Sequence, residues 1–249
     1  MIKSESFNEF IDFCKQRVKL DQTELGVDCE FLPNPKICSK PLFCLIGMEP
    51  SVKNGGLTKT REEIQQGYQN FLTSAEDFIL HFCAYNFLCN QTFNYYITDL
   101  SKGAMTTDDA RRTASQRYPN WLELLRDELR LLGNPITIVI GNSLNVKLEK
   151  LGYTADYHIP HYSWSGSRWI KKIYENLNPC PFWNKFDHIE SEIHSFSDML
   201  MKHAEYTEEM RINRLNGKFE HYDYLRPWRI RLFAVYKSMF QEIYQSHFA

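Results

Sequence analysis

One stretch of the chain decides the fold, and it reads Phe43-Cys44-Leu45-Ile46-Gly47-Met48-Glu49-Pro50-Ser51. Apolar residues lead into a glycine, and one carboxylate follows before a proline that prevents the strand from continuing. An unbroken apolar run is typical of a buried parallel strand, and open α/β sheets bind ligands at the carboxyl ends of such strands. The stretch therefore predicts a central strand that presents Glu49 from a fixed loop. The alternative is an ordinary turn with a solvated glutamate.

Working outward, the sequence alternates strand and helix patterns. Further strands are expected at residues 94–100 and 135–141, with a short extended segment at 156–160. Helices are expected at residues 6–18 and 143–151, and a further helix begins at about Arg168. Two more helix starts are predicted from capping residues: Ser74 with Asp77 at capping-box spacing, and Asn120 with Glu123. A polar loop at residues 52–60 is long enough to cover a ligand. This order predicts an α/β fold with three αβα layers around a mostly parallel four-stranded sheet.

The strand patterns stop at about Trp183, and two helical patterns follow at residues 189–203 and 228–248. A charged link at 211–224 joins them. We therefore predict an α/β domain at residues 1–183 and a C-terminal helical extension at 184–249 that packs on the same domain.

Composition places the chain among folded, intracellular proteins. Of its 249 residues 43% are hydrophobic and 14% aromatic, which is enough for a large core and argues against disorder. The seven cysteines include no C-x-x-C pair, so reduced thiols and a cytoplasmic location are expected, although a metal site from Cys29, Cys38 and Cys44 remains an alternative. No segment has the pattern of a signal peptide or a membrane span.

Charge is distributed unevenly along the chain. The net charge of −2 argues against a protein that binds nucleic acid over its whole surface. Between Tyr157 and Tyr174, however, no acidic residue occurs, while lysine, arginine and histidine do. This segment predicts a local basic edge that touches a partner with one face. His158 and His161 flank Pro160, which breaks a helix and so argues against a helical histidine pair for a metal.

Three predicted strand ends carry polar residues, and together they resemble the uracil-DNA glycosylase superfamily. Gly47-Met48-Glu49-Pro50-Ser51 is similar to its first motif, G-x-[DNE]-P-[GS]. Ile97-Thr98-Asp99-Leu100 resembles its TN-L strand, and His161-Tyr162-Ser163 resembles its H-P-S motif. The resemblance covers roughly residues 41–172. It implies a monofunctional DNA glycosylase that needs no cofactor and no metal and acts on single- or double-stranded DNA.

The resemblance also implies a role for individual residues. Glu49 would stabilise the cationic sugar and orient the attacking water, and His161 would donate a hydrogen bond to the departing base. Base recognition falls to Asp99 and Met48 once the nucleotide is flipped into the pocket. The expected phosphate contacts are Ser51, Ser163, Arg168 and Lys171. The aromatic residue that stacks on the base stays open among Tyr68, Phe71 and Phe87, and Trp164 or Trp169 could stack on DNA.

The chain departs from the family pattern at two positions. Tyr162 stands in place of the H-P-S proline, which alters the turn that carries the histidine. Asp99 stands where uracil-reading members have asparagine. An ionised aspartate only accepts hydrogen bonds, and the N4 amine of cytosine is a donor. We therefore expect a modified cytosine, hydroxymethylated or glucosylated as in some bacteriophages, and a role in antiviral defence. Capping of a turn by Asp99, or its pairing with Lys102, is the alternative.

Other functions remain open at the sequence level. A uracil-DNA glycosylase in base-excision repair and a non-catalytic DNA-binding protein would both suit the same scaffold. A hydrolase that acts on a free nucleotide or a small glycoside is a third alternative. We expect a monomer that binds DNA and no membrane.

Overall fold

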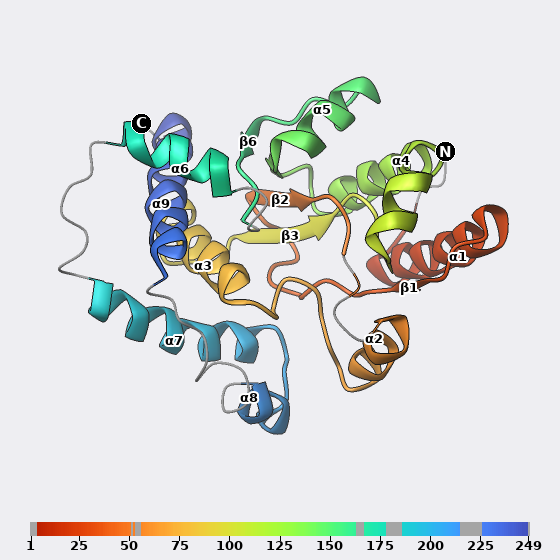
Figure 1. Ribbon diagram of the computed structural model, residues 1–249, viewed down its shortest axis with the longest axis horizontal. Helices are drawn as coiled ribbons and strands as arrows, with labels where there is room; N and C mark the ends of the chain where they lie inside the picture. The colour runs from red at the N-terminus through yellow and green to blue at the C-terminus, as the bar shows by residue number, and fades with distance from the viewer. Residues whose placement is uncertain are drawn as a thin grey trace.

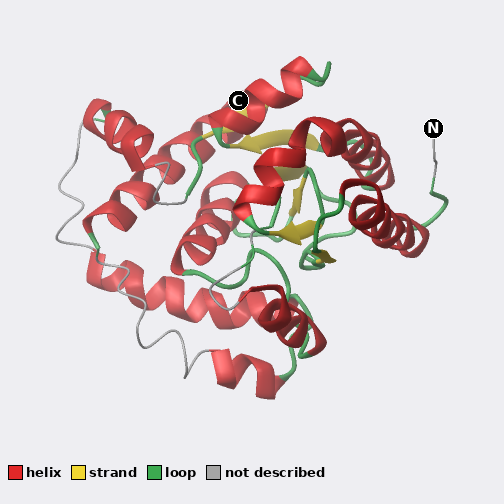
Figure 2. Cartoon of the chain, turned by 45° about the vertical axis from the view of Figure 1, so that its right-hand side comes forward, coloured by secondary structure: helices red, strands yellow, loops and turns green. Residues whose placement is uncertain are grey.

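The computed structural model describes residues 4–50, 52, 56–162, 167–177, 186–214 and 226–248. Its centre is a four-stranded sheet of order β3-β2-β5-β6 in which all neighbours are parallel. The strands are β2 (Phe43–Gly47), β3 (Tyr95–Asp99), β5 (Ile136–Ile140) and β6 (Tyr157–Ile159). The predicted α/β class and the central parallel sheet are confirmed (Figures 1 and 2).

Alternating residues of β2 divide the core into two layers. Phe43 and Leu45 pack on one face of the sheet, and Cys44 and Ile46 pack on the other. This is the two-residue period of a strand that is covered on both sides. The first face is covered by α3 (Ala75–Cys83), α7 (Phe186–His203) and α9 (Pro227–Phe248), and the second by α1 (Phe7–Leu25), α4 (Thr107–Leu131) and α5 (Asn142–Lys150).

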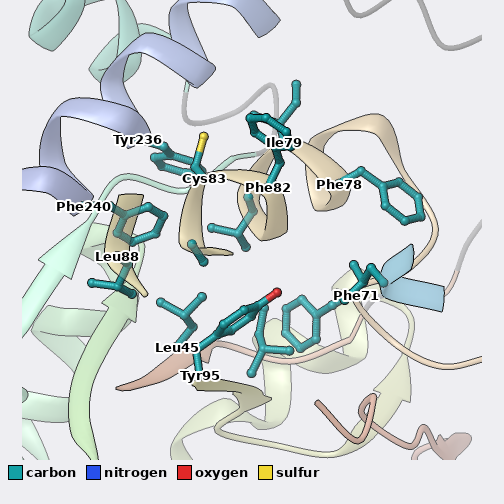
Figure 3. Close-up of a cluster of buried hydrophobic side chains, with 14 of the residues drawn as sticks. Leu45, Phe71, Phe78, Ile79, Phe82, Cys83, Leu88, Tyr95, Tyr236 and Phe240 are labelled. Carbon is teal, nitrogen blue, oxygen red and sulfur yellow. The ribbon is translucent and has the colours of Figure 1, made fainter. Parts of the chain in front are cut away.

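The helix α9 is part of the main core. Tyr236 and Phe240 are fully buried, and Figure 3 shows them in one cluster with Leu45 of β2 and Tyr95 of β3. The same helix contacts α3 and α6 (Ser167–Asn176). The short helix α8 (Glu208–Arg214) follows α7 and extends into the start of the segment expected as a charged link at 211–224.

Capping side chains mark the helix starts that the sequence predicted well. Ser74 and Asp77 form the expected capping box at the start of α3. Ser6 caps α1, which continues to Leu25 and ends at Gly26 with a φ of 61°. The helix is therefore longer than the predicted 6–18, because the apolar stripe fades while the helix continues.

Two predicted boundaries were wrong. Asn120 does not cap a helix, because α4 begins at Thr107 with Thr106 as its cap and contains Pro119 in its interior. Burial of the residues on both sides of the proline maintains the helix there. Residues 56–60 of the expected loop belong to a helix, α2 (Gly56–Gln65), whose Ile64 packs on a small apolar cluster with Tyr68.

Several short elements had no predicted counterpart. An antiparallel pair joins β1 (Cys29–Phe31) to β4 (Gly103–Met105), and a π-helical turn at Ala84–Leu88 follows α3. Within the described ranges, no helix is both long enough and apolar enough to cross a membrane.

Candidate functional site

The site lies where two neighbouring strands send the chain to opposite faces of the sheet. After β2 the chain continues to α3 on one face, and after β5 it enters α5 on the other. Open α/β sheets bind their ligands in the crevice that such a reversal leaves at the carboxyl ends of the strands. A pocket of about 1070 Å³ opens at this place, at the upper end of the usual range for ligand sites.

The carboxyl ends of three strands line this pocket. Met48 and Glu49 follow β2, Gly141 follows β5, and His161 follows β6 with one residue between. The structure thus brings the two residues of the predicted catalytic pair, Glu49 and His161, onto one pocket although they are far apart in the sequence.

Glu49 is held at both carboxylate oxygens by consecutive residues of α4. Nη2 of Arg117 donates to Oε2 over 2.6 Å, and the hydroxyl of Tyr118 donates to Oε1 over 2.7 Å. Only 11% of the Glu49 side chain is exposed. Because each carboxylate oxygen accepts two hydrogen bonds, one acceptor position on each remains for a water or a substrate.

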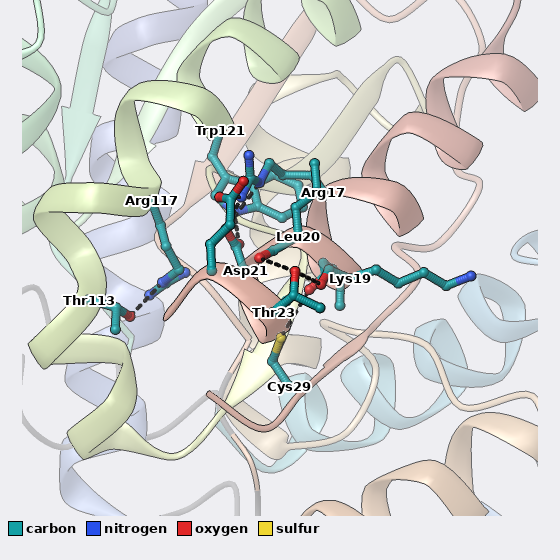
Figure 4. Close-up of polar contacts among 12 residues, drawn as sticks. Arg17, Lys19, Leu20, Asp21, Thr23, Cys29, Thr113, Arg117 and Trp121 are labelled. Carbon is teal, nitrogen blue, oxygen red and sulfur yellow. Dashed lines mark hydrogen bonds and ion pairs between the residues drawn. The ribbon is translucent and has the colours of Figure 1, made fainter. Parts of the chain in front are cut away.

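Arg117 is itself fixed from several sides. Its side chain is fully buried and also donates to the hydroxyl group of Thr113 over 2.8 Å (Figure 4). A further hydrogen bond runs to the hydroxyl group of Ser101 over 3.1 Å. Sequence reasoning missed Arg117 and Tyr118, because the helix was expected to begin after them, at Asn120. The T-x-x-D spacing of Thr106 and Asp109, which cap the true start of α4, is the signal that would have revealed a continuous helix.

The turn that carries His161 is fixed from two sides. The hydroxyl of Tyr236 on α9 donates to the carbonyl of Pro160 over 2.7 Å. The imidazole packs against Gly141, where a Cβ atom would lie 3.3 Å from the Cβ of His161, and it stacks on the ring of Tyr162 at 4.8 Å. Tyr162 thus supports the histidine in the place where the family motif has proline.

Burial lowers the pKa of His161, and the negative charge of Asp77 opposes this effect only in part. The imidazole is therefore held in its neutral form at neutral pH, with one N–H group as donor. A neutral donor can stabilise a developing anion in the pocket without first losing or gaining a proton.

Asp99 lies beside the pocket residues, but it does not line the pocket itself. Its Oδ2 accepts a hydrogen bond from Nδ2 of Asn70 over 2.5 Å, and its Oδ1 occupies the space that a Cβ at Gly47 would need. Lys102 donates to the backbone carbonyl of Asp99 and forms its ion pair with Glu128 at 2.8 Å. The expected alternative of a carboxylate pair between Asp99 and Lys102 is therefore not what the structure contains.

Burial raises the pKa of Asp99 to about 8, against the opposing effects of Lys102 and the Asn70 hydrogen bond. The expectation of an ionised Asp99 was wrong for neutral pH, because the buried site disfavours the charged form. A protonated carboxyl both donates and accepts hydrogen bonds, as an asparagine amide does.

Of the predicted phosphate contacts, neither of the two that the structure describes lines the pocket. Arg168 is exposed and Lys171 pairs with Glu175 at 3.7 Å, and neither lines the pocket. Ser51 and Ser163 lie outside the described residues, as does Trp164. Trp169 does line the pocket and is 54% exposed.

The aromatic candidates for base stacking do not line the pocket. Tyr68 and Phe71 are buried, and Phe87 is partly buried against Phe233. Phe71 lies nearest to the site, since its ring would be 3.1 Å from a Cβ at Gly47, and its φ of 59° is unusual for a large residue.

No model of a known protein family matches the chain, and no curated protein matches it. Among the described residues, no cluster of three or more histidine, cysteine, aspartate or glutamate side chains is arranged to hold a metal ion. The case for a function therefore rests on the geometry of the pocket and on the residue types that line it.

Proposed function

We propose that the protein is a DNA glycosylase that hydrolyses the N-glycosidic bond of a flipped-out base and leaves an abasic site. One observation carries the proposal: a fixed carboxylate, Glu49, and a neutral imidazole, His161, line the same pocket. Glycosidic hydrolysis needs a carboxylate near the sugar and a donor near the leaving group.

Glu49 suits the first of these tasks. As the C1′–N bond breaks, the sugar becomes an oxocarbenium-like cation, which a nearby carboxylate stabilises. The free acceptor positions of Glu49 orient a water toward C1′ and receive its proton when the C1′–O bond forms. The hydrogen bonds from Arg117 and Tyr118 hold the carboxylate in place, so little reorganisation is needed during the reaction.

His161 suits the second task. The bonding electrons leave with the base, and negative charge collects on its carbonyl oxygen. The N–H of a neutral imidazole donates to this oxygen and lowers the barrier. Tyr236 holds the neighbouring carbonyl of Pro160, which supports the position of the turn that carries His161.

We propose that the excised base is a modified cytosine. We also propose that the protein acts in antiviral defence and that it acts as a monomer. The carbonyl oxygen of protonated Asp99, and either oxygen of the ionised form at higher pH, would accept a hydrogen bond from the N4 amine of cytosine. Uracil is the competing substrate, and the raised pKa of Asp99 favours it, because a protonated carboxyl can donate to the uracil carbonyl. Excision of uracil should therefore slow as Asp99 ionises between pH 7 and 9, whereas excision of a modified cytosine should not slow.

The test is strand scission by alkali after incubation with duplex and single-stranded DNA that contains uracil, cytosine, hydroxymethylcytosine or glucosylated hydroxymethylcytosine. We expect scission at one modified cytosine. Preference for uracil would replace the proposed substrate with its competitor, and absence of scission on every DNA would refute the glycosylase.

The variant Glu49→Gln separates an enzyme from a DNA-binding protein. Loss of the carboxylate should slow excision by about 10²–10⁴-fold, while binding to an oligonucleotide with a tetrahydrofuran abasic analogue should persist. Glu123→Gln is the matched control, because Glu123 lies on the surface of α4, where it pairs with Arg126. Unchanged excision by Glu49→Gln would remove Glu49 from the reaction.

A further inference from the structure

We infer that Arg111, Lys147 and Lys150 form an anion subsite on one rim of the pocket, which holds phosphates of the DNA strand whose nucleotide enters it. The inference rests on the proposed function and extends it to residues that the sequence motifs do not include. Arg111 lies on α4, and Lys147 and Lys150 lie on α5.

All three cations line the pocket, and none has a carboxylate partner among the residues that the structure describes. Nζ of Lys147 lies 3.7 Å from Sδ of Met48 and 5.0 Å from the centre of the Tyr118 ring. A thioether and a ring face are weak partners for an ammonium group, so its charge remains available to a ligand.

Two other exposed arginines on α4 are neutralised by carboxylates of the same helix. Arg112, adjacent to Arg111, pairs with Asp109 at 2.7 Å, and Arg126 pairs with Glu123 at 2.6 Å. The helical spacing that produces such pairs is common on solvated surfaces. Arg111, Lys147 and Lys150 differ from these two arginines because they line the pocket and have no carboxylate partner among the described residues.

The remaining lining of the pocket also favours an anion. Glu49 is the one acidic residue among the described lining residues, and Arg117 already balances its charge. Asn142 and Ser143 begin α5 and line the pocket, and Gly141 at the N-cap offers no side chain to their N–H groups. The positive end of this helix adds to the attraction of the three side chains.

Phosphate is the anion that fits both this site and the proposed reaction. Contacts between basic side chains and phosphates position a protein on a DNA strand without reading its sequence. The subsite lies on the same pocket as Glu49 and His161, so a phosphate bound there would place the adjoining sugar near the carboxylate. We therefore assign the subsite to phosphates that flank the flipped nucleotide.

The experiment measures binding of a fluorescent oligonucleotide with a tetrahydrofuran abasic analogue over a series of salt concentrations. Each phosphate contact contributes about 0.9 to the slope of log affinity against log salt concentration. Arg111→Ala combined with Lys150→Ala should therefore lower the slope by about 2, and Lys147→Gln by about 1. The control Arg112→Ala should leave it unchanged, because that side chain is held by Asp109.

Thermal melting of each variant verifies that the fold is retained. The double variant is the decisive one, because Arg111 and Lys150 are exposed and their replacement should leave the fold intact. A wild-type slope in the double variant would overturn the inference, even if the protein excises a base. A reduced slope without base release by the wild type would support the subsite and refute the glycosylase. Failure of the wild type to bind the oligonucleotide would refute the subsite.

Discussion

Replacement of Asp99 by asparagine tests both the energetics of the site and its chemistry. The two side chains have nearly the same shape, so the contact with Asn70 and the fit against Gly47 can be retained. Only the asparagine lacks a proton to lose. Comparison of the variant with the wild type therefore isolates the loss of unfolding free energy that ionisation of the buried carboxyl group causes.

The magnitude follows from the pKa of Asp99, which burial raises from 3.8 to about 8. Between these values the folded protein binds a proton that the unfolded chain has lost, so the free energy of unfolding falls as pH rises. Each pKa unit corresponds to about 1.4 kcal/mol. The carboxyl should thus cost about 2 kcal/mol of stability at pH 5 and about 4 kcal/mol at pH 7.

Urea unfolding of the wild type and of Asp99→Asn at pH 5, 6, 7 and 8 is the assay. The new amide must find an acceptor, and an unpaired N–H would offset part of the gain by about 1–3 kcal/mol. This offset is the same at every pH, so the test is the change with pH. We expect the stability of the variant relative to the wild type to grow by about 4 kcal/mol from pH 5 to pH 8.

Asp12→Asn serves as the control, because Asp12 is 66% exposed and its replacement should add no comparable pH dependence. A difference between Asp99→Asn and the wild type that stays constant from pH 5 to pH 8 would refute the reasoning. The same variant should move excision toward uracil, because its amide can donate at every pH. Unaltered base preference would remove Asp99 from base recognition.

Three further predictions concern the supports of the site. Burial lowers the pKa of His81 to about 4. The free energy of unfolding should therefore fall by about 3 kcal/mol as pH decreases from 6.5 to 4, because the unfolded chain gains a proton there that the folded protein does not. Urea unfolding of His81→Asn should not show this decrease. Tyr236→Phe removes the hydrogen-bond donor to the carbonyl of Pro160. The free energy of unfolding should fall by about 1–3 kcal/mol, and kcat for excision should decrease. A kcat equal to that of the wild type would contradict a role of Tyr236 in positioning His161. Gly47→Ala places a Cβ 2.2 Å from Oδ1 of Asp99, so the free energy of unfolding should fall by about 1–3 kcal/mol. The double variant Gly47→Ala with Asp99→Ala removes this clash and should melt at a higher temperature than Gly47→Ala alone.

The sequence predicted the central sheet well because its strands are short runs rich in apolar, aromatic and β-branched residues. Residues 43–47 are buried at every position, and so are residues 95–99. The capping box at Ser74 was equally informative, since it satisfies backbone donors locally. The strands β1 and β4 span three residues each, which is too short for an alternating pattern to be seen.

The partners of Glu49 could not be predicted from local patterns. Arg117 lies 68 positions away in the sequence, and the spacing of Asn120 and Glu123 suggested a helix start after it. A proline in a helix removes one hydrogen bond, but burial of Trp121 and Tyr118 on either side outweighs that cost. The pKa of Asp99 was missed for a related reason: burial at the end of a strand depends on Asn70 and Phe71, which only the folded chain brings near.

The hydrogen bond from Tyr236 to Pro160 has a consequence for the order in which the protein is assembled. It spans 76 positions, so the loop that holds His161 stays without its anchor until α9 has docked. During synthesis the parallel sheet can begin to form from residues up to Ile159, yet the histidine would not be aimed at Glu49. A growing chain would thus possess the scaffold well before it possesses the chemistry. The activity proposed for this site would then require the final helix, whose Tyr236 holds the loop in position.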